Sequence, residues 1–251
     1  MSANDELEQS FISHLIELRN RLLRVVLSVL VVFLAMSPFA NEIYHFLAQP
    51  LMHFLPENSS MVAIDVVSPF LTPFKLVLVA AIFISVPIIL YQFWAFVAPG
   101  LYSHEKRMIA PLLVASTVLF ALGMIFAYFV VFPLVFGFLT SAAPEGVTVM
   151  TDIAKYLDFV LTMFFAFGVA FEVPIITIVL VWTGVVTPHQ LADKRPYVIV
   201  GAFIIGMFLT PPDAISQTLL AIPIWLLFEV GLLFSRLFVR KGEGKRIAKD
   251  K

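Results

Sequence analysis

The stretch of sequence that decides the fold is "SFISHLIELRNRLLRVVLSVLVVFLAMSPFA", residues 10–40. In its first half, apolar residues recur at helical spacing, at Phe11, Leu15, Leu18 and Leu22. From residue 23 onward the stretch is almost continuously apolar. The pattern predicts an amphipathic helix over residues 1–22 that lies at a membrane surface and runs directly into a membrane-spanning helix.

The composition of the whole chain also indicates a membrane setting. Hydrophobic residues make up 61% of the 251 residues and charged residues only 13%, whereas ordinary soluble domains carry about 25% charged residues. A soluble fold of this length could not bury so much apolar surface, so lipid must be the solvent for most of it. The absence of cysteine excludes disulfides, thiolate metal sites and cysteine nucleophiles. The sequence therefore predicts an all-α integral membrane protein.

Six hydrophobic segments follow one another along the chain, and we expect six transmembrane helices. The segments cover residues 23–40, 74–97, 109–133, 157–182, 197–210 and 215–235. Prolines lie inside the second, fourth and sixth segments, at Pro87, Pro174 and Pro223, and helices in lipid tolerate such kinks. We find no internal repeat or linker, so we expect a single membrane domain over residues 1–251. Its parts are the N-terminal helix (1–22), a six-span bundle (23–235) and a basic tail (236–251).

The fifth and sixth segments are predicted to be short. Thirteen residues, Tyr197–Leu209, separate Pro196 from Thr210, and at ~1.5 Å per residue they reach only ~20 Å of a ~30 Å hydrocarbon core. In the sixth segment the uncharged apolar stretch from Thr218 to Phe228 is eleven residues long. Local thinning of the bilayer, or cover by partner helices, would relieve such a mismatch.

Lysine and arginine are sorted by position. Fourteen of the sixteen lie at the two ends of the chain and in alternate loops, and only Lys75 and Lys155 lie in the other loops. Positive charge concentrates on the cytoplasmic side of membrane proteins, so both termini are expected to face the cytoplasm. We expect the tail "RKGEGKRIAKDK" to contact lipid headgroups and not nucleic acid.

Two carboxylates on this predicted cytoplasmic side allow more than one interpretation. Glu17 could simply form a surface pair with Arg21 one helical turn away, and Glu105, in "PGLYSHEKR", could be a solvated loop charge. Together they could instead form a clamp for a cationic ligand. Arginine would suit such a clamp best, because its planar guanidinium binds a carboxylate bidentately and keeps its charge.

Glu172, in "FGVAFEVP", is the most costly residue of the chain to place in lipid, at ~2.5–3.5 kcal/mol on insertion scales. It could pair with other spans, line a polar cavity or relay protons. The last possibility defines an alternative function, a proton-coupled six-span secondary transporter, although no inverted repeat supports it. Glu229 is expected to be structural. The spacing of His45 and His53 does not favour a metal site, and no motif indicates a cofactor.

Seven blocks of the sequence, between about residues 10 and 238, carry a resemblance to a known family. They are "HLIELRNRLL", "SPFLTPFKL", "QFWAFVAPGLYSHEKR", "FAYFVVFPL", "FGVAFEVP", "KRPYVIVGAFIIGMFLTPPD" and "SQTLLAIPIWLLFE". Together they resemble TatC, the multi-spanning core subunit of the twin-arginine protein translocase. The resemblance implies a cupped, concave bundle in the bacterial cytoplasmic (inner) membrane that is not an enzyme.

The resemblance also implies a function and a binding site. TatC-like proteins bind the Arg-Arg signal peptide of folded precursor proteins and, with the small single-span subunits TatA and TatB, mediate export driven by the proton motive force. Their two signal-binding glutamates correspond to Glu17 and Glu105. We assign four residues to the same cytoplasmic site in supporting roles: His14, Arg19, Phe96 and His104. Further expected partners are membrane lipids and other copies of the chain, as an oligomer of TatBC units.

Three further groups of residues are assigned by the same resemblance. Glu172 and Tyr128 are expected to line the concave cavity. Met207, Thr210 and Gln217 are expected to contact the partner helix. Pro50, Phe70 and Asp213 are expected to belong to a periplasmic cap, and Asp213, which follows two prolines, is also expected to cap the N-terminus of the sixth span.

Overall fold

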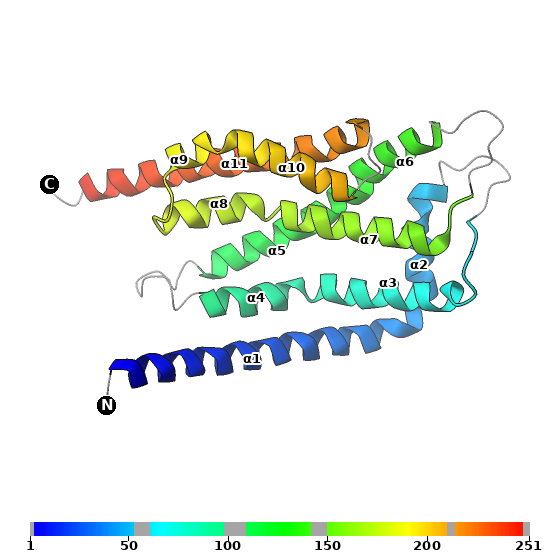
Figure 1. Ribbon diagram of the computed structural model, residues 1–251, viewed down its shortest axis with the longest axis horizontal. Coiled ribbons are helices and arrows are strands. Elements are labelled where there is room, and N and C mark those ends of the chain that lie inside the picture. The colour runs from blue at the N-terminus through cyan, green and yellow to red at the C-terminus, as the bar shows by residue number, and fades with distance from the viewer. Residues whose placement is uncertain (1–2, 53–60, 98–108, 142–149, 210–213, 248–251) are drawn as a thin grey trace. The chain divides into compact units, whose positions relative to one another are not determined.

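The computed structural model describes residues 3–52, 61–97, 109–141, 150–209 and 214–247, and all statements of structure below concern these residues. They form helices (Figure 1) and contain no β-strand beyond one isolated bridge, which joins Val62 to Asp152. The described residues group into two compact units, of which the first comprises residues 1–47 and 65–117 and the second residues 48–64 and 118–251. The expectation of a single membrane domain stays a prediction.

The first unit is built on one long helix. Helix α1 (Ala3–Met36) has 34 residues and runs without a break from the amphipathic stretch into the apolar one, as predicted. It contacts helices α3 (Ser68–Ile84) and α4 (Val86–Val97), which lie alongside it in Figure 1. A short 3-10 helix, η1 (Ser37–Phe39), joins α1 to α2 (Ala40–Met52).

Helices α3 and α4 form a bent pair, with an angle of 48° at the break between Ile84 and Val86. The bend lies just before Pro87, whose ring has no N–H to donate and clashes with the carbonyl of the preceding turn. This is the kink predicted for the second segment.

The second unit contains most of the remaining helices, and two of its candidate spans are irregular within their length. Helix α5 (Ile109–Phe126) passes from the first unit into the second and continues through a π-helical turn, η4 (Ala127–Val131), into α6 (Phe132–Ser141). The π turn directly precedes Pro133, and an inserted turn of this kind accommodates a missing hydrogen-bond donor. Helices α7 (Ile153–Ala170) and α8 (Val173–Trp182) are separated at Phe171 and Glu172, just before Pro174, where a kink was predicted.

The last three helices complete the second unit: α9 (Pro188–Asp193), α10 (Arg195–Leu209) and α11 (Ala214–Ile247). Helix α11 lies against both α8 and α10, as Figure 1 also shows. Where α7, α10 and α11 meet, the buried cluster is made largely of small side chains: Ala170, Ala202, Ala221 and Ile224. Small residues let helices approach closely in a membrane, where packing and not water exclusion drives association.

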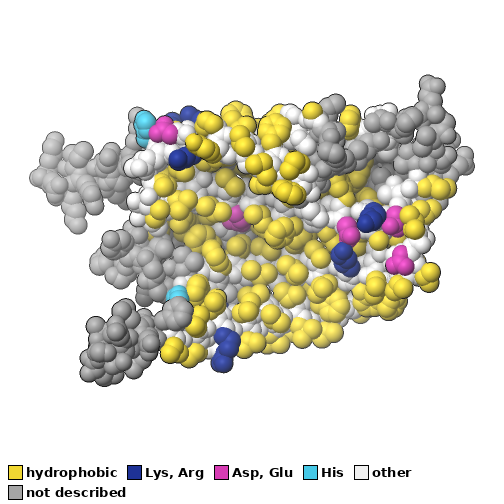
Figure 2. Space-filling model, viewed as in Figure 1, with side chains coloured by type: hydrophobic (Ala, Val, Ile, Leu, Met, Phe, Trp, Pro, Cys, Tyr) yellow, Lys and Arg dark blue, Asp and Glu magenta, His cyan; other side chains and the backbone are white. Residues whose placement is uncertain are grey.

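The surface of the described residues is largely apolar. Large hydrophobic side chains are exposed on nearly every helix, among them Leu34 (62%), Phe129 (68%) and Phe208 (79%). Figure 2 shows hydrophobic side chains over most of the visible face, with few charged ones between them. Such a surface is stable in lipid and not in water.

The predicted segments all lie on helices, but they do not all qualify equally as spans. Four helical stretches are long and apolar enough to cross a membrane, or five if the bent pair α3–α4 counts as one span. Helix α10 is shorter, as predicted for the fifth segment.

The prediction of a short sixth span is wrong. Residues Gln217–Leu237 of α11 form a helical stretch of 21 residues that is long and apolar enough on average to cross a membrane. The sequence argument ended this span at Glu229, but the charge of that carboxylate is compensated by an ion pair with Arg195. The helix also continues through Pro223.

Candidate functional site

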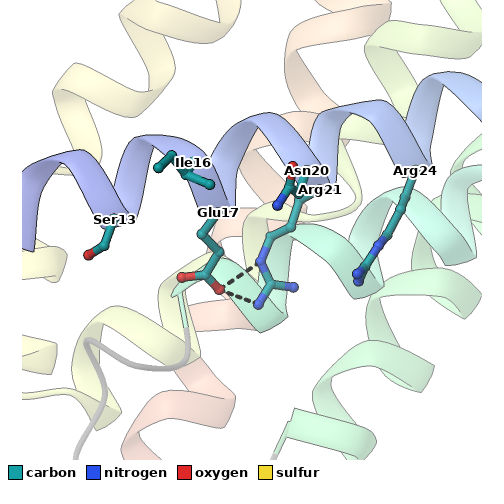
Figure 3. A pocket seen from close by; sticks show the side chains of 6 residues that line it. All are labelled: Ser13, Ile16, Glu17, Asn20, Arg21 and Arg24. Atoms are coloured by element: carbon teal, nitrogen blue, oxygen red, sulfur yellow. Dashed lines mark hydrogen bonds and ion pairs between the residues drawn. The ribbon is translucent and has the colours of Figure 1, made fainter.

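The predicted site on α1 is a small hollow with a charged wall. Glu17 and Arg21 lie one turn apart on the helix and form an ion pair. The Arg21 guanidinium donates from Nε at 2.9 Å and from Nη2 at 2.5 Å, both to the same oxygen, Glu17 Oε1. Figure 3 shows these two contacts and the residues that line the hollow: Ser13, Ile16, Glu17, Asn20, Arg21 and Arg24. Its volume is about 350 Å³.

Helix α4 also contacts Arg21. Arg21 Nη1 donates to Gln92 Oε1 on α4 at 3.3 Å. Gln92 is buried, at 8% exposure, and the side chain of Arg21 is 19% exposed, against 37% for Glu17. The arginine is therefore the more enclosed member of the pair, and the carboxylate faces the hollow.

An aromatic contact lies next to Glu17. The His14 ring stacks on Phe96 of α4, with ring centroids 4.4 Å apart and an angle of 27° between the rings. His14 Nδ1 lies 3.9 Å from Glu17 Oε2, the carboxylate oxygen that Arg21 does not engage. The structure thus brings together three of the predicted site residues: His14, Glu17 and Phe96.

The other predicted residues of this site either do not line the hollow or lie outside the described residues. Arg19 donates to the adjacent Asn20 at 3.3 Å and is not among the described residues that line the hollow. Glu105 and His104 lie outside the described residues. The predicted pairing of Glu17 with Glu105 therefore stays a prediction.

Sequence reasoning missed the part played by Gln92. It lies 71 positions from Arg21, and no local pattern links two positions so far apart. The available signal was a single amide side chain inside an apolar segment, since a polar group in such a place needs a partner.

The two residues predicted to line a cavity both lie where a helix is irregular. Glu172 occupies the N-cap position of α8 and is half-buried, with its Oε1 atom inaccessible to solvent. Tyr128 lies in the π-helical turn, and its ring contacts Phe129 and Phe132 at centroid distances of 4.9 and 6.2 Å. Their shared cavity stays a prediction.

Two of the three predicted partner-contact residues, Met207 and Gln217, lie on α10 and α11, which contact each other. Met207 is exposed, at 51%, and Gln217 on α11 is half-buried. A Cβ atom built on the neighbouring Gly206 would lie 3.5 Å from the Gln217 carbonyl oxygen, an ordinary van der Waals contact. Thr210, the third residue of this group, lies outside the described residues.

The residues predicted for a periplasmic cap are only partly described. Pro50 lies within α2, but its side chain is not among those described. Phe70 is 66% exposed on α3 and packs against Phe74, with ring centroids 5.0 Å apart. Asp213 lies outside the described residues, so its capping role is untested.

A second ion pair lies at the start of α10. Arg195 donates from Nε and Nη2 to the two oxygens of Glu229, at 2.5 and 2.7 Å. This bidentate geometry is the strongest that arginine and a carboxylate can form. It supports the expectation that Glu229 is structural.

These features define a class of protein: an α-helical, multi-pass membrane protein with a polar, charged site beside the start of its first span. The sequence model of the family "Sec-independent protein translocase protein (TatC)" matches residues 13–223. The chain is 60% identical to the TatC protein of Haemophilus influenzae, over 97% of this chain and 94% of that protein. It is 58% identical to the TatC protein of Escherichia coli O6:H1, over 98% of this chain and 94% of that protein.

A solved structure gives the same result. A crystal structure of a twin-arginine translocase receptor TatC superimposes with a TM-score of 0.80 at 41% identity, covering 89% of this chain and 98% of that one. The chain therefore belongs to the TatC family. It is a multi-pass membrane protein and a component of the Sec-independent protein translocase, and not an enzyme.

Proposed function

We propose that this chain is the receptor subunit of its translocase and binds the paired arginines of precursor signal peptides through Glu17 and Glu105. The observation that carries the proposal is the position of Glu17, whose carboxylate faces a hollow with its Oε2 atom turned away from Arg21. The similar crystal structure is of a protein named a translocase receptor, which agrees with this role.

Charge complementarity supports an arginine ligand at this site. A contact between a carboxylate and a guanidinium is worth roughly 1.5–3 kcal/mol when shielded, and 1 kcal/mol or less when exposed to water and salt. Two such contacts discriminate only modestly, so the apolar part of the signal must add affinity by packing against the spans. His14 and Phe96 support the site from its rim, and we assign His104 and Arg19 to the same region.

The proposed topology has six spans with both termini in the cytoplasm, in the bacterial inner membrane. The asymmetric distribution of lysine and arginine supports it. In this orientation Glu17 faces the compartment in which precursors fold. The concave surface would carry Glu172 and Tyr128, and the periplasmic cap would carry Pro50, Phe70 and Asp213.

The proposed partners are the single-span TatA and TatB subunits and further copies of the chain, with the proton motive force as the energy source. Met207, Thr210 and Gln217 are proposed to contact the partner helix. Thr210 and Gln217 are polar side chains that need partners in lipid, and Met207 is an exposed apolar side chain near them in the sequence. Membership of a translocase family weighs against the alternative of a proton-coupled transporter that uses Glu172 as a relay.

Site-specific photo-crosslinking tests the receptor role. A crosslinker at position 17 or 105 should capture a precursor with an Arg-Arg signal, and Glu17→Ala and Glu105→Ala should each weaken capture while membrane insertion stays normal. The double variant should lose less than the sum of the two if either change already abolishes binding. Glu42→Ala, which removes an exposed carboxylate on α2, is the matched control and should bind normally. Undiminished capture by the double variant would refute the clamp.

A further inference from the structure

The proposed arginine site already holds an arginine of its own chain. Arg21 uses two of its donors on Glu17 Oε1 and a third on Gln92 Oε1. These are the interactions that a signal-peptide guanidinium would seek, and Arg21 presents the same chemical group on the same helix.

We infer that Arg21 is an internal occupant of the site, which the arginine of an incoming signal must displace from Glu17. The inference rests on the function proposed above and concerns the regulation of the same site. It makes Arg21 a residue that sets how tightly any cationic signal can bind.

The geometry favours displacement over shared occupancy. An arginine binds a carboxylate best when two parallel N–H groups reach both oxygens, and in this site Oε1 is taken while Oε2 faces the hollow. An incoming guanidinium that engages both oxygens therefore needs the one that Arg21 holds. Two guanidinium groups in contact with a single carboxylate also repel each other.

Gln92 is a second hydrogen-bond acceptor for Arg21. Its side-chain oxygen already accepts from Arg21 Nη1 at 3.3 Å, and because Gln92 lies on α4 it does not depend on the position of Glu17. When the signal takes Glu17, the Arg21 guanidinium keeps this acceptor and does not lose all its partners. The exchange is therefore between two hydrogen-bonded states, which keeps its cost small.

Arg24 provides a matched comparison. It lines the same hollow, and in Figure 3 its guanidinium lies apart from the Glu17–Arg21 pair. Its removal changes the charge of the site by the same amount without freeing Glu17. Methionine is a suitable replacement at both positions, since it is unbranched and has a similar helix propensity.

The test measures the binding of a fluorescent peptide with an Arg-Arg signal to the full-length chain in lipid nanodiscs. An exposed contact of this kind shifts an equilibrium by about two- to fivefold, so Arg21→Met should bind the peptide about two- to fivefold more tightly than Arg24→Met does. Binding that is equal in the two variants, or weaker in Arg21→Met, would overturn the inference, because Arg21 would then be a bystander or a positioning residue.

A second variant keeps the inference testable if Arg21→Met does not insert normally. Arg21→Lys keeps the positive charge but loses the planar fork that donates to Glu17 and Gln92 together, so it should bind the peptide more tightly than Arg24→Lys does. Equal binding by the two lysine variants, or weaker binding by Arg21→Lys, would contradict displacement.

Glu17→Gln in the same assay distinguishes failure of the proposed function from failure of the displacement step. If Glu17→Gln binds the peptide as well as the parent does, the proposed function fails at this residue. If it binds poorly while Arg21→Met shows no gain over Arg24→Met, the function stands and only the displacement step fails.

Discussion

Glu172 illustrates how a single ionisable residue can be accommodated inside a span. It lies at the break between α7 and α8, in the N-cap position of α8, although its side chain makes no capping hydrogen bond there. The helix dipole favours negative charge at such a position by about 0.3–1 kcal/mol. The helix break created before Pro174 thus offsets part of the cost of placing this carboxylate in lipid.

This position leads to a prediction for Glu172→Gln. A neutral amide can make similar hydrogen bonds and loses only the modest interaction with the helix terminus, so the variant should retain most export of an Arg-Arg precursor. Glu172→Leu, which keeps the volume but cannot hydrogen-bond, should export less. Export would be measured in cells with the amount of membrane-inserted protein held equal. Complete loss of export in Glu172→Gln, with signal binding intact, would indicate a proton relay.

Gly123 lies where α5 and α7 of the second unit approach each other very closely. A Cβ atom built on Gly123 would lie 2.4 Å from the carbonyl oxygen of Phe167 on α7, closer than any real contact allows. Because the obstacle is backbone, a side-chain rotation cannot relieve it. The helices themselves would have to separate.

The Gly123→Ala variant is therefore predicted to lose about 1–3 kcal/mol of stability through overpacking. Gly201→Ala is the control, since Gly201 is also helical but has no described atom within 4 Å of its Cβ position. That change should be neutral or slightly stabilising, because alanine is the better helix former. Thermal unfolding of the two purified proteins in detergent measures the difference, and equal midpoints would contradict the packing argument.

For whole helices, the sequence predicts the positions of irregularities better than it predicts whether the helix bends, breaks or continues there. Pro87 and Pro174 were expected to kink their segments, and the structure has a 48° bend before the first and a helix break before the second. Pro223 was expected to do the same, yet α11 continues through it. A proline removes one donor at a known place, but the packing around it decides whether the helix bends, breaks or continues.

Contacts between helices far apart in sequence could not be predicted. Glu17 and Arg21 could be paired from their spacing alone, because positions four apart on a helix are neighbours. Gln92 and Arg21 are 71 positions apart, and Arg195 and Glu229 are 34 apart. Such pairs depend on how the helices pack, and composition and periodicity do not specify packing. The missed Arg195–Glu229 pair is also the reason why the sixth span was judged too short.

The whole molecule must fit a bilayer with spans of unequal length. At ~1.5 Å per residue, the 15 residues of α10 reach about 22 Å, short of a ~30 Å hydrocarbon core. The apolar part of α11, Gln217–Leu237, has 21 residues and reaches about 31 Å. Of these two helices only α10 is too short, and tilting it would only increase the mismatch.

The last prediction follows from this mismatch and from the partner contacts proposed for Met207 and Gln217. If the bilayer is thinned beside α10 and a partner helix covers its exposed apolar face, one additional turn of leucine between Ile204 and Ile205 should remove the mismatch. It should impair partner assembly or export more than it impairs signal binding. Replacing Ile204 and Ile205 by leucine without lengthening the helix is the control and should have little effect.

Cysteines at positions 207 and 217 should also crosslink to a single-span partner more readily than cysteines at Leu27 or Val118, which are exposed on α1 and α5. Equal crosslinking from all four positions, or full export by the lengthened variant, would show that the short helix does not recruit the partner.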